Sequence, residues 1–436
     1  MQVFPKLCDA KKIAACGKYN VLPMYCEMLS DFTTPMETLR MLKDVSTHCY
    51  LLESARADET WGRYTFLGFD PKMELTCING EMKVGDLTFQ TDQPSVYIRR
   101  VLDAYKSPRL EGLPPFTGGF VGYFSYDYVG YAEPCIKRTV QDTEQFKDVD
   151  LMLFDRVIAF DHVRQKIILI VNISLNDIDT GYNHGMMQLR QLCDLIRNGK
   201  KKREDGGKIK GEITPLFDRK SFCEMVKKAK AHIREGDIFQ IVLSNRFSAP
   251  FSGSLLNTYR VLRTINPSPY MFYFSGTDVE VAGASPETLV KLENGVLSTF
   301  PLAGTKPRGE TPAEDEQRQQ QLLHDEKELA EHDMLVDLGR NDLGKISKFG
   351  TVRMEQLHQI ERFSHVMHIG STVRGEIRED CDALDAIQAV LPAGTLSGAP
   401  KIRACQLIAE MENNKRGIYG GAIGYQRTCY LFRRAV

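Results

Sequence analysis

A polar, glycine-rich stretch at 198–211 divides the chain into two parts that differ in their apolar patterning. It reads NGKKKREDGGKIKG and has neither a helical nor a strand period, so we predict an exposed, mobile linker. Before it, segments such as 61–69 and 151–171 have the pattern of strands joined by short turns. After it, helices and strands alternate. The sequence therefore predicts an N-terminal region over 1–197 and a second region over 212–425.

The composition is that of a globular protein with a large core. Of 436 residues, 42% are hydrophobic and 26% charged, and the net charge of −1 provides no basic surface for nucleic acid or a membrane. The densest apolar run, Ile167–Val171, is too short to span a bilayer and is predicted to be a buried strand. The N-terminus lacks a signal-peptide pattern. Eleven cysteines without a C-x-x-C pair indicate reduced packing residues. We expect a cytoplasmic protein.

Two carboxylates are spaced to share one face of a predicted helix. Thr311 and Pro312 have the pattern of a helix start, and the long helix that follows carries Glu328 and Glu331. Side chains three residues apart on a helix lie about 5–6 Å apart at Cβ. Paired carboxylates on a rigid element suit Mg²⁺, which prefers oxygen ligands. The alternative is a pair of solvated surface glutamates.

Three segments punctuated by glycine or proline are candidate sites. In 301–309, Gly304 and Thr305 offer a backbone N–H and a hydroxyl to a carboxylate. The stretch 392–401 is a glycine-rich turn into a helix, which can bind an anion, although it lacks the P-loop spacing. Glu287 follows an apolar strand, where a general acid could work. Each has a structural alternative, a plain turn or a structural glutamate.

Two histidines flank the start of a further predicted strand. In an extended segment, His365 and His368 point to opposite faces, so at most one lines a given site. A histidine that only satisfies a neighbour's hydrogen bond is the alternative. The run Ile238–Leu243 is a predicted strand that places Gln240 within the second region.

Taken together and in this order, the motifs of 215–425 closely resemble the chorismate-binding enzymes, and among them the large subunits of anthranilate synthase. The stretches 51–55, 62–68 and 115–124 are similar to the N-terminal region of those subunits. The resemblance implies an α+β fold, a large antiparallel β-sheet sandwich with helices on its outer faces. It also implies chorismate as the substrate and Mg²⁺ as the cofactor.

The resemblance assigns the two helical glutamates to the metal. Glu331 matches the residue that ligates Mg²⁺ directly, and Glu328 matches its outer-shell neighbour. A divalent ion between enzyme and substrate carboxylates would neutralise like charges in one cleft. Glu287 matches the general acid that protonates the departing ring hydroxyl.

Five further positions match substrate contacts of the family. Gly304 and Thr305 match contacts to a substrate carboxylate, and His368, not His365, matches the active-site histidine assigned to pyruvate elimination. Thr395 matches a residue near the reacting ring, and Tyr419 matches a substrate-contacting tyrosine.

The implied reaction has two steps and needs a source of ammonia. Ammonia attacks chorismate as the hydroxyl leaves, and loss of pyruvate from the aminodeoxyisochorismate formed gives anthranilate. In the family, a separate glutaminase releases the ammonia from glutamine, and its cysteine nucleophile sits in a G-x-C-x-G turn. The sequence has no such turn. A glutamine amidotransferase subunit (component II) is therefore the implied partner.

Two positions distinguish anthranilate synthases from other members. Water-adding relatives carry a lysine base where this chain has Gln240, and a neutral amide cannot deprotonate water. Aminodeoxychorismate synthases typically carry a nucleophilic lysine where this chain has Ala303. Both residues favour anthranilate synthase, and aminodeoxychorismate synthase is the alternative.

The family's feedback site for tryptophan has counterparts in both regions. A Leu-Leu-Glu-Ser motif and an Asn-Pro-Ser-Pro-Tyr-Met segment could hold the ammonium and indole N–H of an amino acid. A structural turn at the proline-rich segment is the alternative. The residues matched are Glu53, Ser54, Pro269, Tyr270 and Met271.

The tail 426–436 departs from the family pattern. Full-length members continue with strands and a helix that supply an arginine, a glycine-rich loop, a second glutamate pair and a lysine. Arg433 and Arg434 are not placed to replace these groups. We expect an unpaired sheet edge and a weakly active or inactive chain. A non-catalytic subunit that binds tryptophan or the glutaminase is the corresponding alternative.

Overall fold

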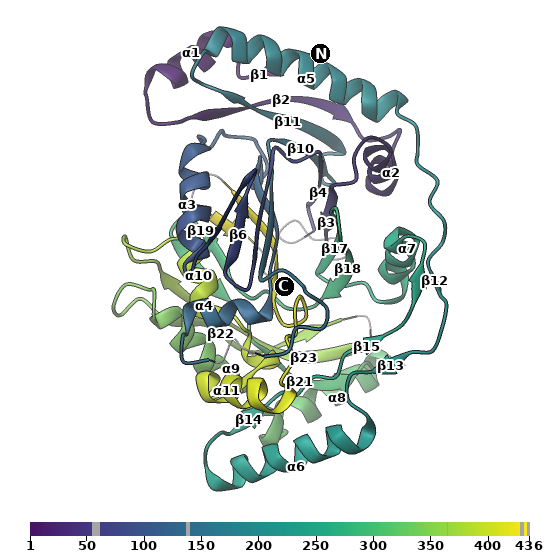
Figure 1. Ribbon diagram of the computed structural model, residues 1–436, viewed down its shortest axis with the longest axis vertical. Coiled ribbons are helices and arrows are strands. Elements are labelled where there is room, and N and C mark those ends of the chain that lie inside the picture. Colours follow the sequence, from purple (N-terminus) through teal and green to yellow (C-terminus); the bar gives the residue numbers. More distant parts are fainter. Residues whose placement is uncertain (55–61, 137–139, 364, 428–430, 434–436) are drawn as a thin grey trace.

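The computed structural model describes residues 1–54, 62–136, 140–363, 365–427 and 431–433 (Figure 1). Two antiparallel sheets pack face to face, and most helices lie on their outer faces. This arrangement confirms the predicted α+β sandwich. Among the described residues the helices are α1 (Leu7–Ala15), α2 (Pro35–Val45), α3 (Pro94–Ala104), α4 (Val129–Ala132), α5 (Ile178–Asn198), α6 (Arg219–Glu235), α7 (Leu255–Ile265), α8 (Pro312–Leu323), α9 (Glu326–Gly344), α10 (Ala383–Val390) and α11 (Lys401–Glu412), with 3₁₀ turns η1 (Tyr126–Tyr128) and η2 (Gly394–Leu396).

The first sheet has eight strands within the described residues. They are β1 (Val3–Phe4), β2 (Val21–Leu29), β3 (Cys49–Glu53), β4 (Tyr64–Phe69), β10 (Arg156–Asp161), β11 (Lys166–Ser174), β17 (Tyr270–Ser275) and β18 (Glu280–Ser285). Their order is β1-β2-β11-β10-β4-β3-β17-β18, and every neighbouring pair is antiparallel. Helices α5, α2 and α7 pack along it (Figure 1).

The second sheet has twelve strands within the described residues. They are β5 (Met73–Ile78), β6 (Glu81–Val84), β7 (Leu87–Gln90), β8 (Gly119–Phe124), β9 (Val149–Phe154), β19 (Lys291–Glu293), β20 (Val296–Thr299), β21 (Leu302–Pro307), β22 (Arg353–Arg362), β23 (Val366–Glu376), β25 (Ala422–Arg427) and β26 (Leu431–Arg433). The order is β21-β23-β20-β19-β26-β25-β8-β9-β5-β6-β7, with β22 paired to β23. Both sheets thus take strands from both sides of 198–211.

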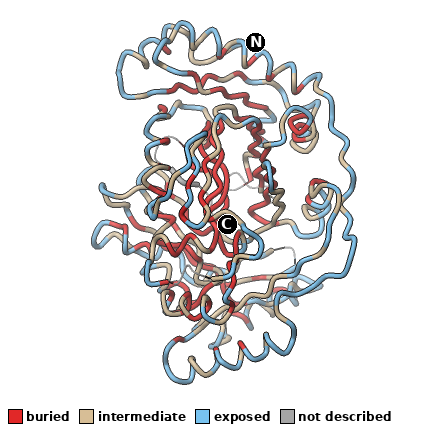
Figure 2. Tube along the Cα trace, in the orientation of Figure 1, coloured by how far each residue is buried: buried red, intermediate tan, exposed pale blue. Residues whose placement is uncertain are grey.

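Strand β11 shows why the sheets stack. Its run Ile167–Val171 is buried throughout, as predicted. Ile167 and Leu169 pack with the apolar residues beneath α5, whereas Ile168 and Ile170 pack in the cluster between the sheets. Alternate residues of a strand point to opposite faces, so a strand covered on both sides is continuously apolar. Figure 2 shows the buried residues concentrated along the strands.

Aromatic side chains fill the space between the two sheets. The ring centroids of Tyr50 on β3 and Phe154 on β9 lie 4.7 Å apart, and those of Phe66 on β4 and Tyr425 on β25 lie 5.7 Å apart. Both pairs meet edge to face, the arrangement that aromatic quadrupoles favour. These contacts fix the position of the second sheet, and with it the candidate site, against the first.

Two sequence predictions are corrected. The long helix expected from Thr311 is two helices, because the Asp325 side chain accepts a hydrogen bond from the Glu328 amide and caps a new helix, α9. Of the predicted strand Ile238–Leu243, the residues paired as a strand are β14 (Gln240–Ile241), which pairs with β24 (Gly398–Ala399). Two other short pairs join β12 (Lys208–Ile209) to β16 (Phe251–Ser252) and β13 (Thr214–Pro215) to β15 (Phe247–Ser248).

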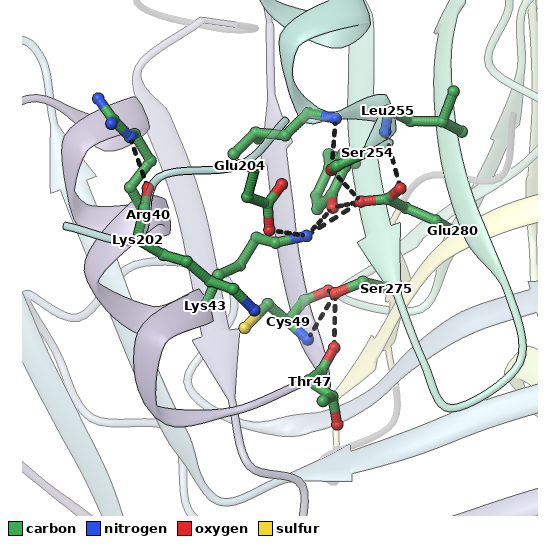
Figure 3. A network of polar contacts seen from close by, with 12 residues as sticks. Arg40, Lys43, Thr47, Cys49, Lys202, Glu204, Ser254, Leu255, Ser275 and Glu280 are labelled. Atoms are coloured by element: carbon green, nitrogen blue, oxygen red, sulfur yellow. Dashed lines mark hydrogen bonds and ion pairs between the residues drawn. The ribbon is translucent and has the colours of Figure 1, made fainter. Parts of the chain in front are cut away.

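The segment 198–211 is exposed along most of its length, and several contacts hold it in place, one of them at a buried side chain. The side chain of Glu204 is 9% exposed and forms an ion pair with Lys43 Nζ of α2 at 3.0 Å (Figure 3). The same ammonium lies 3.0 Å from Glu280 on β18 and contacts the hydroxyl of Tyr273. This buried network holds the segment against the first sheet.

The sheet edge that was expected to be unpaired near the C-terminus is paired. Strand β26 pairs with β25 over Leu431–Arg433, and Arg433 is also in register with Lys291 of β19. Part of the predicted non-family tail is therefore a strand of the second sheet. Residues 428–430 and 434–436, including Arg434, lie outside the described residues. In the described part of the chain, the helices are too short or too polar to cross a membrane.

Candidate active site

The two predicted metal-binding glutamates lie on α9, which packs on β21 and β23. Glu331 accepts a hydrogen bond from Gln240 Nε2 at 3.1 Å. Glu328 lies at the first turn of the helix, and its nearest cation, Lys327 Nζ, is 4.0 Å away. Glu331 thus contacts a neutral amide, and Glu328 has its nearest cation 4.0 Å away. Both carboxylates therefore keep oxygens available to a hard cation.

Glycine is required where β21 passes α9. Gly304 has a φ of 65°, and the pairing of β21 with β23 shifts register between Ala303 and Thr305. A Cβ added at Gly304 would lie 3.2 Å from side-chain carbons of Ile369 and Leu322 and 3.4 Å from Glu328 Cβ. The bulge and the missing side chain together bring the β21 backbone against the helix that carries the glutamates.

His368 lies directly opposite Thr305 in the β21–β23 pair. Its Nδ1 is 2.9 Å from the Gly304 carbonyl oxygen and 3.1 Å from Thr305 Oγ1. A carbonyl only accepts, so Nδ1 carries the proton and Nε2 is the basic nitrogen of the neutral ring. His365 is exposed, and its Nε2 lies 3.3 Å from the Ile265 carbonyl oxygen. The structure thus joins His368, Gly304 and Thr305 and leaves His365 apart.

Glu287 and Thr395 are in contact. Thr395, in η2, donates a hydrogen bond from Oγ1 to Glu287 Oε2 at 2.7 Å. Burial raises the pKa of Glu287 from 4.5 to about 7, although the Thr395 hydroxyl and the Lys401 ammonium both act to lower it. The two side chains line a cavity of about 30 Å³ next to Leu335 and Gly339 of α9. A carboxyl group that holds a proton near neutral pH can serve as a general acid.

The segment 392–401 forms the wall of this site. Gly398 has a φ of 148°, and an added Cβ would lie 2.2 Å from the Gln240 carbonyl oxygen, so only glycine fits where β24 meets β14. Lys401 begins α11 and is buried, with its Nζ 2.5 Å from Asp342 Oδ2 and 2.8 Å from the Val390 carbonyl oxygen. The partners of Lys401 are intramolecular, and the same turn positions Thr395 and Gln240.

Tyr419 is placed elsewhere. It is 55% exposed and lines a cavity of about 520 Å³ together with Glu412 and Arg416. Arg416 connects this cavity to the acid site, because its Nη1 donates to the Leu396 carbonyl oxygen at 2.7 Å, next to Thr395. The structure therefore separates Tyr419 from the Glu287–Thr395 pair by one buried arginine.

The sequence prediction missed the buried pair of Glu412 and Arg416. Their side chains are 3% and 2% exposed, and Nη2 of Arg416 lies 2.6 Å from Glu412 Oε1. The spacing of four residues was a visible signal, but the same spacing is common on solvated helix faces. A cavity of about 620 Å³ beside Tyr126, Asp127 and Lys415 was also missed.

The predicted tryptophan residues adjoin one another across β3 and β17. Glu53 is in register with Met271, and Pro269 and Tyr270 come immediately before it. Ser54 follows β3, and residues 55–61 lie outside the described part of the chain. Tyr259 and Arg263 of α7, which the sequence did not reveal, bind the Glu53 carboxylate at 2.6 and 2.9 Å.

The predicted tryptophan residues adjoin the candidate acid site through the side chain of Tyr270. The Tyr270 hydroxyl contacts the Thr288 hydroxyl, and Thr288 directly follows Glu287. Pro269 and Tyr270 also line a cavity of about 60 Å³ with Gly370 and Ser371 of β23, the strand that carries His368. Tyr270 therefore adjoins both the residue after Glu287 and the strand that carries His368.

Comparison with known proteins identifies the family of this chain. Residues 47–428 match the family of chorismate binding enzymes, so the chain belongs to that family. It is 42% identical to anthranilate synthase component 1 of Acetivibrio thermocellus over 434 residues, 97% of this chain and 87% of that protein. It is 43% identical to the component 1 protein of Aquifex aeolicus over 93% of this chain and 84% of that protein.

A solved structure supports the same grouping. The crystal structure of anthranilate synthase component I from Streptococcus pneumoniae TIGR4 superimposes with a TM-score of 0.77 at 35% identity. The match covers 87% of this chain and 84% of that one. The predicted family and fold are thereby confirmed.

Proposed function

We propose that the chain is the chorismate-using subunit of an anthranilate synthase, which converts chorismate and ammonia to anthranilate and pyruvate. The observation that carries the proposal is the half-buried carboxyl group of Glu287, which accepts a hydrogen bond from the Thr395 hydroxyl and whose pKa burial raises to about 7. Such a group can protonate a leaving hydroxyl at neutral pH. The likeness to component 1 proteins along almost the whole chain supports the same reaction.

Residues of this chain supply the proton movements. Protonated Glu287 gives its proton to the departing ring hydroxyl, which leaves as water while ammonia attacks the ring. In the second step a ring carbon gives up its proton, the C–O bond to the enolpyruvyl group breaks, and that group takes up a proton and leaves as pyruvate, so the ring becomes aromatic. In the neutral ring of His368, Nε2 carries the lone pair that can accept a proton, because Nδ1 donates to the Gly304 carbonyl oxygen. Thr305 and the bulge at Gly304 lie beside it to orient a substrate carboxylate.

Glu331 and Glu328 are the residues that would hold Mg²⁺. They project from adjacent turns of α9, and no lysine or arginine lies closer than 4.0 Å to Glu328 among the described residues. When bound, the cation supplies charge neutralisation between these carboxylates and the anionic substrate. Gln240, hydrogen bonded to Glu331, is a neutral neighbour that orients this carboxylate.

The first test is anthranilate fluorescence from the 436-residue chain with chorismate, Mg²⁺ and high ammonium, which bypasses the glutaminase. Glu331→Gln removes one charged metal ligand, and we expect the rate to fall about 10- to 100-fold at limiting Mg²⁺. Glu326→Gln, on the exposed side of the same helix, is the matched control and should leave the rate unchanged. Equal rates for the two variants would contradict the metal assignment. A folded chain without product would favour a subunit that binds only tryptophan or the partner.

The alternative reaction, aminodeoxychorismate formation, has less support. Ala303 lies in β21 opposite Ile369 and is buried, so this position offers no amine for covalent catalysis. Aminodeoxychorismate without anthranilate in the same assay would reverse this choice. For the source of ammonia we propose a separate glutamine amidotransferase subunit, since the relatives are named component 1.

We further propose that tryptophan binds beside Glu53 and Met271 and inhibits the reaction. A ligand that binds only the folded state stabilises it by about 2.7 kcal/mol at 100 times its Kd. We therefore expect tryptophan to raise the thermal midpoint of the chain and Ser54→Ala to reduce this rise. Ser174→Ala, at the exposed end of β11, is the control. No rise with the unsubstituted chain, or an undiminished rise with Ser54→Ala, would place the ligand elsewhere.

A further inference from the structure

Two cysteine thiols meet where α5 crosses β2. Cys26 Sγ on β2 lies 3.7 Å from Cys193 Sγ on α5, although 167 residues separate them in sequence. Helix α5 packs closely here, since a Cβ added at Gly185 would lie 2.9 Å from Met24 Sδ on β2. In the described part of the chain, no other pair of cysteine sulfurs is in contact. Figure 1 shows α5 lying along the part of the sheet that contains β2 and β11.

The two thiols differ in environment. Cys26 is fully buried, whereas Cys193 is partly exposed, with its Sγ 3.6 Å from Met1 Sδ. The hydrogen bond from Cys26 lowers the pKa of Cys193 to about 7, and Arg197, one turn further along α5, acts in the same direction. Hydrogen bonding and burial raise the pKa of Cys26 far above its ordinary value, so it remains a thiol. Cys193 is therefore the accessible nucleophile and Cys26 its enclosed neighbour.

We propose that Cys26 and Cys193 form a reversible disulfide when the chain is exposed to hydrogen peroxide. The Cys193 thiolate attacks one peroxide oxygen, the O–O bond breaks, and a sulfenic acid and hydroxide result. The Cys26 sulfur then attacks the Cys193 sulfur, the S–OH bond breaks, and the Cys26 proton leaves with the hydroxyl group as water. Two thiols lose two electrons in total, and one peroxide becomes two waters.

The geometry requires only a short movement. A disulfide has an S–S distance of about 2.05 Å, so the two sulfurs must approach by about 1.7 Å. The bond would tie α5 to the strand that pairs with β11, and so to the sheet that also carries Glu53 and Met271. A dithiol reductant would restore both thiols.

The test treats the reduced full chain with increasing hydrogen peroxide, blocks free thiols with an alkylating reagent and maps peptides by mass spectrometry. We expect a linked peptide pair containing Cys26 and Cys193, an intact mass lower by two hydrogens, and reversal by dithiothreitol. The pair should form at least severalfold faster than the exposed Cys8, Cys16 and Cys223 are oxidised. Oxidation should also raise the thermal midpoint, because a cross-link constrains the unfolded chain.

Two variants separate the roles of the thiols. Cys26→Ser should abolish the linked pair and leave a sulfenic acid at Cys193 that dimedone traps. Cys16→Ser, at the residue that follows α1, should leave the linked pair unchanged. The proposal is overturned if peroxide oxidises Cys8 or Cys16 while Cys26 and Cys193 remain separately alkylated, or if they link only after unfolding in urea.

Discussion

Replacing Glu287 by glutamine is expected to lower kcat for anthranilate formation by about 100- to 10,000-fold, the range that a general acid typically contributes. The amide has nearly the same shape and keeps the contact with Thr395, but it has no acidic proton for the leaving hydroxyl. Chorismate affinity should change little, because Glu287 acts on the reacting bond. The measurement is kcat and KM by anthranilate fluorescence at saturating ammonium and Mg²⁺.

The pH dependence should identify the same group. The proton-bearing form is active, so kcat should fall as pH rises through about 7, by about tenfold for each further pH unit. Thr395→Val removes a hydrogen bond that favours the ionised carboxylate, so the fall should move to higher pH. The raised pKa of Glu287 also makes the stability of the folded chain depend on pH. Because folding raises the pKa of Glu287 from 4.5, its contribution to stability is complete below that pH and is lost as pH rises through about 7.

Glu293→Gln is the control for these measurements, since Glu293 lies on β19 and pairs with Lys291 at 2.9 Å, outside the site. It should leave kcat and its pH dependence unchanged. A Glu287→Gln variant with full activity, or a pH profile that Thr395→Val does not move, would show that another group protonates the leaving hydroxyl.

The sequence predicted the elements that local pattern determines. The apolar run Ile167–Val171 indicated a strand covered on both faces, and β11 is such a strand. The spacing of Glu328 and Glu331 indicated a shared helix face, and both lie on α9. The motif match also selected His368 over His365, and the structure gives only His368 the partners Gly304 and Thr305. Periodicity and motif suffice where neighbours along the chain set the conformation.

Pairings between distant segments could not be predicted in this way. The contact of Gln240 with Glu331 depends on β14 meeting β24, and two-residue strands leave no periodicity to detect. The break between α8 and α9 depends on whether Asp325 caps a helix or faces solvent, and its residue type permits both. Tyr259 and Arg263 reach Glu53 across more than two hundred residues, so no spacing rule connects them.

Glu412→Ala is expected to destabilise the folded chain by about 3–5 kcal/mol, because it leaves the Arg416 charge buried without its partner. Glu412 also accepts hydrogen bonds from the amide and hydroxyl of Ser244, at 2.7 and 3.1 Å, and both would be lost. The measurement is the urea midpoint and slope at neutral pH. Glu410→Ala, on the exposed face of the same helix, removes an equal charge without a buried partner and should change stability by less than about 0.5 kcal/mol.

The same substitution should also lower activity under conditions where the chain remains folded. Arg416 holds the Leu396 and Val242 carbonyl oxygens, both at 2.7 Å, and Leu396 adjoins the threonine that contacts Glu287. Without Glu412 to orient the guanidinium of Arg416, η2 loses a fixed hydrogen bond and Glu287 loses a fixed neighbour.

Replacing both partners by apolar residues of similar size, Glu412→Met with Arg416→Met, should recover much of the stability, since no charge then remains buried. It should not recover activity, because the Leu396 carbonyl would still lack its donor. Recovery of both properties together would mean that the ion pair supports folding alone, and loss of neither in Glu412→Ala would mean that water enters to solvate Arg416.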